Sequence, residues 1–268
     1  MSEYRLDSRK IVEDYIFEKD WRVKENSSSP KCFGGLNKYI AAEVSKDYWL
    51  NYVYPASIRN AYISGDMHIH DLGGLTIYCC GFSLENILLM GVQGIQNIPE
   101  SAPAGHFDSA LSQIANLITV YQNEIMGAVA LNSMDTMLAP FIAKDKLTPK
   151  QVKQALQNFI FAINSNSRGG AEPAFSNVTF DITPPDDMLK KPAIISGKFI
   201  QRPYGDFQKE IDMFNTAFCE LMIAGDAKGR PFEYPIITYN MNKRFDWNNP
   251  ISDLIFIVTG KQIGRAHV

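Results

Sequence analysis

Two histidines and two adjacent cysteines form the densest group of reactive side chains in the sequence. They lie in GDMHIHDL at 65–72 and in YCC at 78–80. We expect 67–72 to be extended, and residues i and i+2 of a strand share one face. His68 and His70 should therefore point the same way. Paired imidazoles can ligate a metal, bind a polar substrate or be satisfied core histidines.

A metal-dependent hydrolase that uses this HxH pair is one alternative function. It would need further His or acidic ligands downstream, but only His106 and His267 remain among the histidines. The four cysteines, at 32, 79, 80 and 219, include no CxxC pair that could hold zinc. We therefore expect no metal site in this chain.

The adjacent cysteines, Cys79 and Cys80, end a second segment, 76–80, that is expected to be extended. Neighbouring strand residues point to opposite faces, so one thiol can face a pocket while the other packs. A free buried cysteine is usually a small hydrophobic residue. The histidines and acidic residues just upstream favour a functional thiol instead, because polar surroundings tune sulfur reactivity.

Two loops offer a place for phosphate. The run Asn26-Ser27-Ser28-Ser29-Pro30 supplies hydroxyls and free backbone amides, which can hold an anion, although it could equally be a solvated turn. The run Arg168-Gly169-Gly170 is a weaker phosphate-loop candidate, because a helix C-cap also explains its glycines.

Composition limits the class of protein. The chain has 268 residues, of which 46% are apolar and 21% charged, with a formal net charge of −3. These values exclude disorder and give no electrostatic footprint for nucleic acid. The N-terminus lacks the apolar core of a signal peptide, and no apolar run reaches the length of a membrane span. We expect a cytoplasmic protein with reduced cysteines.

Hydrophobic periodicity predicts a mixed α/β fold. One helix should carry an apolar stripe from Leu111 to Val129, and another should open with the capping box Thr148-Pro149-Lys150-Gln151 and stop at Arg168-Gly169-Gly170. The remaining expected helices are 8–19, 36–50, 55–64, 83–90 and 207–222, and the expected strands are 175–181 and 232–239.

The distribution of charge marks one stretch of the chain. From 60 to 143 there is no Lys or Arg, although seven acidic residues occur there. A stretch of this kind is either buried core or a subunit interface. At the other extreme, the final IGRAHV matches what a common sequencing adapter encodes before a stop codon. We expect 263–268 to be a non-native read-through tail and the natural protein to continue.

Six ordered segments together resemble the anaerobic (class III) ribonucleoside-triphosphate reductases. The likeness extends from about residue 8 to 262. The matching segments are WRVKENS at 21–27, GDMHIHDL at 65–72, YCCGFSL at 78–84, QNEIMGAVALNSMDTMLAPF at 122–141, NSRGGAEPAFSNVTFD at 166–181 and GRPFEYPIITYN at 229–240.

The resemblance implies a fold and a chemistry. The fold would be the N-terminal part, 1–262, of a ten-stranded α/β barrel of the glycyl-radical enzyme type, without an ATP-cone. The reaction would reduce ribonucleoside triphosphates to 2′-deoxyribonucleoside triphosphates. A glycyl radical passes to a finger-loop cysteine, whose thiyl abstracts the ribose 3′-hydrogen. A second cysteine then donates hydrogen as the 2′-hydroxyl leaves.

The resemblance also implies roles for particular residues. Cys79 matches the hydrogen-donor cysteine, with Cys80 as the fallback, and His68 matches an active-site histidine. Substrate-binding positions would be Asn26, Ser27 and His70. The effector and dimer region would include a helix around 122–140, with Gln122, Glu124 and Asp135.

Partners and cofactors follow from the same resemblance. These are a homodimer, ATP and dNTP effectors, and an iron–sulfur/S-adenosylmethionine activase. Tyr78 replaces the Asn of formate-dependent members, so a thioredoxin-like reductant is expected. The finger-loop cysteine, the structural zinc and the glycyl-radical site would lie beyond this chain, which we expect to be inactive alone. A non-catalytic nucleotide-binding or dimerisation module is the remaining alternative.

Overall fold

The computed structural model describes residues 6–19, 31–93, 99–169 and 172–261. The chain divides into two compact units. The first, here called the helical unit, comprises Met1–Cys80, Tyr121–Ala128 and Ser165–Ala174, and the second, the sheet unit, comprises Gly81–Val120, Val129–Asn164 and Phe175–Val268. The helical unit thus takes in two short segments from the middle of the sequence. The expectation of one continuous catalytic portion over 1–262 stays a prediction.

Three helices form the scaffold of the helical unit. They are α1 (Ser8–Ile16), α3 (Phe33–Tyr48), which runs into the π-helical turn η1 (Trp49–Val53), and α4 (Ala56–Ser64). Helix α1 packs on α3, where the rings of Tyr15 and Tyr39 lie 5.6 Å apart. Gly65 ends α4 with a φ of 84°, a conformation that glycine adopts without strain. The three helices expected in 8–64 are confirmed, with ends shifted by a few residues.

The segment after α4 does not form the strand expected over 67–72. It is irregular and turns at 70–73, where Asp71 has a φ of 54°. A left-handed residue ends the alternation of side chains that an extended strand would impose. The argument that His68 and His70 share a strand face is therefore wrong. Of 76–80, only Cys80 enters a strand.

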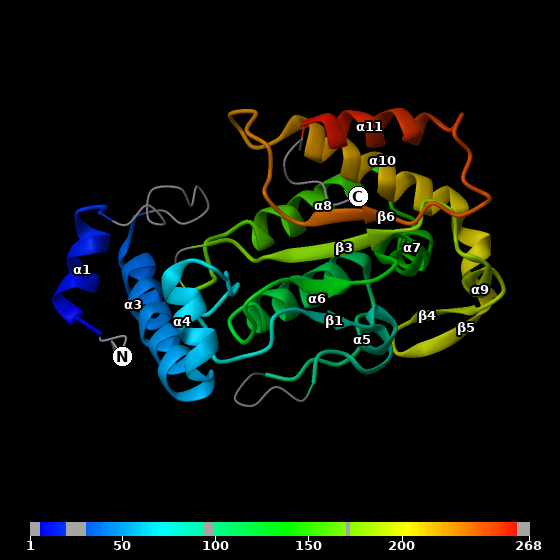
Figure 1. Cartoon of the computed structure of the whole chain (residues 1–268). Coiled ribbons are helices and arrows are strands. Elements are labelled where there is room, and N and C mark those ends of the chain that lie inside the picture. The colour runs from blue at the N-terminus through cyan, green and yellow to red at the C-terminus, as the bar shows by residue number, and fades with distance from the viewer. Residues whose placement is uncertain (1–5, 20–30, 94–98, 170–171, 262–268) are drawn as a thin grey trace. The chain divides into compact units, whose positions relative to one another are not determined.

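A four-stranded sheet is the centre of the sheet unit (Figure 1). Its order is β1 (Cys80–Phe82), β2 (Val129–Leu131), β3 (Ser176–Phe180) and β6 (Ile236–Tyr239). Strand β2 runs parallel to β3, and β3 runs parallel to β6. The alternation expected over 175–181 is confirmed, because alternate residues of β3 are buried. A separate antiparallel hairpin joins β4 (Pro192–Ile195) to β5 (Lys198–Pro203).

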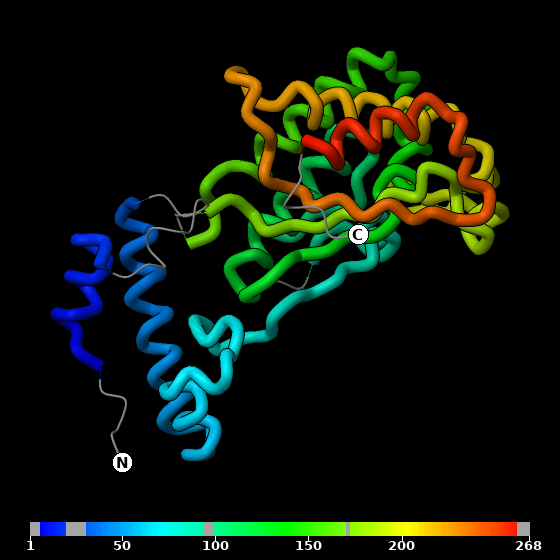
Figure 2. Tube along the Cα trace, turned by 45° about the horizontal axis from the view of Figure 1, so that its top comes forward, coloured from blue at the N-terminus to red at the C-terminus, as the bar shows by residue number. Residues whose placement is uncertain are grey.

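Helices supply the rest of the sheet unit. Helix α10 packs against α7, α8 and α11 (Figures 1 and 2). The capping box predicted at Thr148 is present, and the apolar stripes of α8 and α10 are buried as predicted. The helices are α5 (Leu84–Met90), α6 (Phe107–Tyr121), α7 (Met134–Lys144), α8 (Pro149–Ile163), α9 (Asp186–Leu189), α10 (Gln208–Ala224), α11 (Pro250–Lys261) and the 3₁₀ turn η2 (Tyr204–Phe207).

Three helix predictions are corrected. The helix expected over 111–129 ends at Tyr121, because Val129 pairs with β3 as part of the sheet. The helix expected around 122–140 is a turn, then β2, then α7. Likewise, α8 ends at Ile163 rather than at Arg168-Gly169, and its C-cap is Asn164, whose side chain also bonds the backbone at 233–234. Sheet pairing and distant contacts overrode the local helical pattern.

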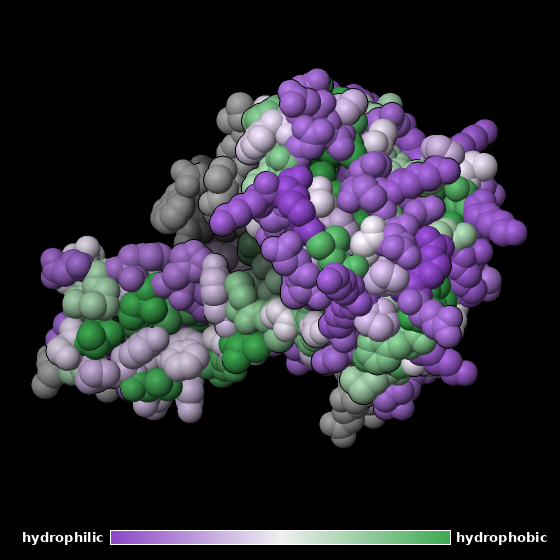
Figure 3. All heavy atoms as spheres, turned by 90° about the vertical axis from the view of Figure 1, so that its right-hand side faces the viewer, coloured by the Kyte–Doolittle hydropathy of each residue, from purple (hydrophilic) through white to green (hydrophobic). Residues whose placement is uncertain are grey.

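Much of the basic-free stretch is core. Every residue of α7 from 134 to 142 is buried, and so is most of one face of α6. The rival reading of this stretch, a subunit contact, stays a prediction. The face over α9, β4 and β5 is mostly hydrophilic, with small apolar patches (Figure 3). Within the described ranges, no helix combines the length and the apolar character needed to cross a membrane.

Candidate active site around Cys79

Cys79 presents an exposed thiol just before β1. Its Sγ accepts a hydrogen bond from the backbone N–H of Ala128 at 3.2 Å. The N–H of Cys80 donates in return to the carbonyl of Ala128 at 3.1 Å, and Cys80 itself is half-buried. The two adjacent thiols thus lie in different environments. The sulfur of Cys79 is fixed by a main-chain donor yet open to a reactant.

The segment 125–128 runs beside 76–80 and holds it in place. The N–H of Met126 donates to the carbonyl of Ile77 at 3.1 Å, and the N–H of Gly127 donates to the carbonyl of Tyr78. Gly127 has no room for a side chain, since a Cβ there would overlap Sγ of Cys79 and lie 2.8 Å from the carbonyl oxygen of Tyr78. Glycine lets the backbone approach the thiol this closely.

An aromatic side chain and a histidine stand next to the cysteine. The rings of His70 and Tyr78 meet edge to face at 5.7 Å, and Nδ1 of His70 lies 2.5 Å from a carboxylate oxygen of Asp71. The pKa of the Tyr78 phenol is raised, first by partial desolvation and then by the neighbouring acidic groups of Asp71 and Cys79. Tyr78 is therefore a neutral hydrogen-bond donor at physiological pH.

The two histidines line different cavities. His68 opens on a cavity of about 740 Å³ whose other lining residues include the cations Lys10, Lys19 and Lys46. His70 lines a cavity of about 340 Å³ together with Tyr78, and Asp71 lines both cavities. The His68 and His70 rings are perpendicular, with centroids 6.1 Å apart. The larger cavity is lined by charges of both signs, because Asp14, Glu43 and Asp71 also face it and its lysines are paired with carboxylates, whereas the smaller one adjoins the residue before Cys79.

The other predicted site residues are spread over the chain. Gln122 is buried and donates from Nε2 to Oγ of Ser167 at 2.6 Å. Glu124 has an exposed side chain, and its carbonyl accepts from Oγ1 of Thr76 at 2.6 Å. Both therefore lie on the turn that leads to 125–128. Asn26 and Ser27 lie outside the described residues, so their predicted role is not tested.

Asp135 belongs to the sheet unit and is fully buried there. Its carboxylate accepts the backbone N–H groups of Asp181 and Ile182 and the amide of Asn215, at 2.8–3.1 Å. The pKa of Asp135 is raised to about 6, first by burial and then by the charge of Asp181. All of these contacts of Asp135 lie in the core of the sheet unit. Its assignment to an effector or dimer region stays a prediction.

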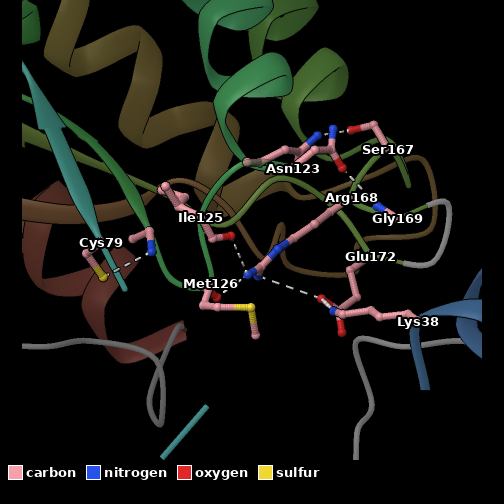
Figure 4. Close-up of polar contacts among 11 residues, drawn as sticks. Lys38, Cys79, Asn123, Ile125, Met126, Ser167, Arg168, Gly169 and Glu172 are labelled. Atoms are coloured by element: carbon pink, nitrogen blue, oxygen red, sulfur yellow. Dashed lines mark hydrogen bonds and ion pairs between the residues drawn. The ribbon is translucent and has the colours of Figure 1, made fainter. Parts of the chain in front are cut away.

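Arg168 is the residue whose contacts the sequence did not indicate. Considered from sequence as part of a phosphate loop, it instead donates to the carbonyl of Met126, and its guanidinium pairs with Glu172 at 3.7 Å (Figure 4). It therefore contacts the segment that holds Cys79. Only its place beside two glycines marked it in the sequence, and no local pattern indicates a partner 42 residues away.

The histidine pair gains no further ligands in the described part of the chain. No group of three or more His, Cys, Asp or Glu residues there is arranged to hold a metal ion. Because a catalytic zinc site takes three protein ligands, the described residues give the hydrolase alternative no support.

Comparison with known proteins decides the family. The family model for anaerobic ribonucleoside-triphosphate reductase matches residues 25–264, which is most of the chain. The chain belongs to this family. Among curated members, the anaerobic ribonucleoside-triphosphate reductase of Escherichia coli K12 is 28% identical over 109 residues, and that of Salmonella typhimurium LT2 is 27% identical over 111 residues. These alignments cover 38% and 39% of this chain but only 15% of each relative.

Solved structures of the family have the same fold. The anaerobic ribonucleotide reductase of Thermotoga maritima with dATP bound in its specificity site matches 93% of this chain with a TM-score of 0.63 at 18% identity. The same enzyme in complex with dATP and CTP matches 94% at the same TM-score. This chain covers 44% of each of those structures. The predicted mixed α/β fold is confirmed, while closure into a ten-stranded barrel stays a prediction.

Proposed function

We propose that this chain supplies the hydrogen-donor cysteine of an anaerobic ribonucleoside-triphosphate reductase, and that Cys79 is this residue. The observation that carries the proposal is the exposed Cys79 sulfur, held by the N–H of Ala128 in a chain of this family. Because Sγ accepts that N–H, its own hydrogen points away from the supporting backbone. Cys80, half-buried behind it, is the second choice.

The chemistry suits a thiol at this place. Reduction replaces the 2′-hydroxyl of a ribonucleoside triphosphate by hydrogen and releases water. The radical of the complete enzyme, which lies outside this chain, would activate the ribose by removal of its 3′-hydrogen, and a thioredoxin-like reductant would supply the two electrons that the loss of the 2′-hydroxyl consumes. Cys79 gives hydrogen to the substrate, because S–H bonds are weak enough to exchange hydrogen reversibly. His68 and His70 bind the polar substrate from the two cavities that Asp71 lines. Asn26 and Ser27 are proposed as further substrate-binding residues on the family resemblance alone.

The complete enzyme is proposed to need further components. They are a radical-SAM activase, a structural zinc, ATP and dNTP effectors and a second subunit. Tyr78 favours a thioredoxin-like reductant over formate. The effector proposal for this chain is supported by the dATP in the specificity site of the Thermotoga maritima relative.

The test uses the product of the complete gene, activated under anaerobic conditions. Cys79→Ser should reduce deoxynucleotide formation to background while leaving dATP binding unchanged, and Cys80→Ser should retain turnover. Retained turnover in Cys79→Ser together with loss in Cys80→Ser would transfer the role to Cys80. A gene product that binds nucleotides but never reduces them would favour the non-catalytic binding module.

A further inference from the structure

We propose that Arg168 is a positioning residue for the Cys79 thiol. Its guanidinium fixes the peptide that joins Met126 to Gly127, and so sets the direction of the next N–H, which is the one that binds the sulfur. The inference rests on the proposed function of Cys79, because it assigns a second residue to the same site.

Three groups hold the side chain of Arg168 in place (Figure 4). One nitrogen, Nη2, donates to the carbonyl of Met126 and lies 3.5 Å from that of Ile125. The other, Nη1, lies 3.7 Å from a carboxylate oxygen of Glu172, which also pairs with Lys38. The backbones of Arg168 and Glu172 bond each other in both directions, at 2.9 and 3.2 Å. The two residues of the ion pair are therefore also joined through their backbones, by an antiparallel bridge.

Burial makes these contacts consequential. The side chains of Arg168 and Glu172 are 12% and 11% exposed. A hydrogen bond from a charged donor to a carbonyl is stronger than a neutral one, and losing one member of a buried ion pair costs more than losing one member of an exposed pair. Planar Arg can reach a carboxylate and a carbonyl at once, which a Lys ammonium on a longer stem does less well.

The clamp acts on one planar unit. The carbonyl of Met126 and the N–H of Gly127 belong to the same peptide, whose six atoms lie in a plane. Arg168 binds this plane at its oxygen, and the carbonyl of Tyr78 binds it at its N–H. With both edges held, the peptide cannot rotate.

The next peptide carries the functional contact. Its N–H, from Ala128, donates to Sγ of Cys79 at 3.2 Å. Between the two planes lies Gly127, the residue type with the widest choice of φ and ψ. Because Gly127 does not by itself fix the orientation of the Ala128 N–H, another contact must hold this N–H in hydrogen-bonding position to the Cys79 sulfur. The hydrogen bond from Arg168 to the carbonyl of Met126 supplies that contact.

The test measures the thiol directly, in this 268-residue chain with Cys80→Ser as background. The variants are Arg168→Gln, Arg168→Lys and, as matched control, Lys38→Gln, which removes a cation from Glu172 but contacts no part of 125–128. The readouts are the alkylation rate of Cys79 by iodoacetamide, with half-buried Cys32 as internal reference, and the hydrogen-exchange protection of the Ala128 amide.

We expect Arg168→Gln to lower the alkylation rate of Cys79 at least fivefold, because the N–H that stabilises the reacting thiolate is no longer held on the sulfur, and to lower Ala128 protection about tenfold, with the Cys32 rate unchanged. Arg168→Lys should give a smaller change in the same direction, and Lys38→Gln almost none. If Arg168→Gln fails to fold by circular dichroism, Arg168→Lys decides.

Wild-type values in both Arg168 variants, or equal changes at Cys79 and Cys32, would overturn the proposal. In the complete enzyme, Arg168→Lys should lower kcat about tenfold with little change in KM. Because alkylation and exchange do not depend on turnover, a failure of this clamp can be told apart from a failure of the Cys79 assignment.

Discussion

Cys79 and Asp135 are held by the same device in two different settings. Each side chain accepts hydrogen bonds from backbone N–H groups: Sγ of Cys79 from Ala128, and the carboxylate of Asp135 from Asp181 and Ile182. The thiol is exposed, whereas Asp135 has no exposed surface. Backbone N–H donors thus orient the reactive thiol of Cys79 in the helical unit, and they stabilise the buried carboxylate of Asp135 in the sheet unit.

The two side chains differ in the number of hydrogen bonds that each accepts. Asp135 receives four donors, namely the backbone N–H groups of Thr136, Asp181 and Ile182 and the amide of Asn215. It lies beside Asp181, which itself accepts from Thr136 and Asn240. Both oxygens of each carboxylate accept at least one hydrogen bond, as buried acidic groups require, whereas Oδ1 of the buried Asn215 has no partner among the described residues. Cys79 receives one backbone donor and keeps its hydrogen for another acceptor. Cys79 can therefore still react or bond with a ligand, and its neighbour Tyr78 lines a cavity. The Asp135 carboxylate has no such freedom, which separates the candidate site from the structural cluster.

The largest expected effect is on the Asp135 cluster. Asp135→Ala leaves the backbone N–H groups of Thr136, Asp181 and Ile182 and the Asn215 amide without this acceptor, and it opens a cavity. An unsatisfied buried donor costs about 1–3 kcal/mol, and we expect the free energy of unfolding to fall by roughly 3–5 kcal/mol. Urea unfolding followed by circular dichroism measures this loss.

An exposed carboxylate in the same unit provides the control. Asp187 is exposed, and Asp187→Ala should change the free energy of unfolding by no more than about 0.5 kcal/mol. An Asp135→Ala protein as stable as Asp187→Ala would remove the distinction between the two regions, because the buried donors would then have found other acceptors.

The pH dependence of stability gives the next largest effect. Burial and the neighbouring Asp181 raise the pKa of Asp135 from 3.8 to about 6. A carboxyl whose folded-state pKa is raised binds its proton more readily when folded. Ionised Asp135 therefore destabilises the folded chain, and protonation relieves this cost. The free energy of unfolding should increase as pH falls from about 7 to 4 and decrease again as pH rises through 6. The expected gain is of the order of 1–3 kcal/mol.

Asp135→Asn isolates this group, because the amide does not titrate. The stability of the natural chain relative to the variant should increase between pH 7 and pH 4. A relative stability that instead falls toward pH 4 would mean that the four donors to the carboxylate outweigh its desolvation and lower its pKa.

How much of this could be predicted from sequence depends on the range of the interactions. The stripes of α8 and α10 and the cap at Thr148 are local, and the sequence predicted them. The alternation around His68 suggested a strand but lies in irregular chain, since Asp71 turns left-handed and no neighbouring strand pairs with it in the described chain. Alternation alone does not supply a partner strand.

The site was only half predictable for the same reason. Cys79 stood out by residue type and by its resemblance to the family. Arg168, Gly127 and Asp135 act through partners more than forty residues away in sequence. One signal was nonetheless present for Asp135: a lone acidic residue in an apolar helix is buried only when it is bonded.

A smaller effect is expected from Gly127→Ala, which tests the close approach to Cys79. The new Cβ would overlap Sγ and crowd the carbonyl of Tyr78, so the thiol must move. Overpacking of this kind typically costs about 1–3 kcal/mol, here confined to 76–80 and 125–128. Alkylation of Cys79 should change severalfold, whereas Gly81→Ala, where a Cβ meets nothing within 4 Å, should leave it unchanged. Equal rates in both variants would show that the thiol does not depend on this contact.

The smallest effect should come from Lys38→Met. Lys38 pairs with Glu172, but its side chain is 34% exposed, so solvent screens much of the attraction. Pairs of this kind contribute about 0–1 kcal/mol, and we expect a loss in this range by urea unfolding. The buried partner on the other side, Arg168, continues to neutralise Glu172 when Lys38 is gone. A loss above about 2 kcal/mol would mean that Lys38, rather than Arg168, is the main cation that holds Glu172. The contacts that support the Cys79 segment would then depend on helix α3, which carries Lys38.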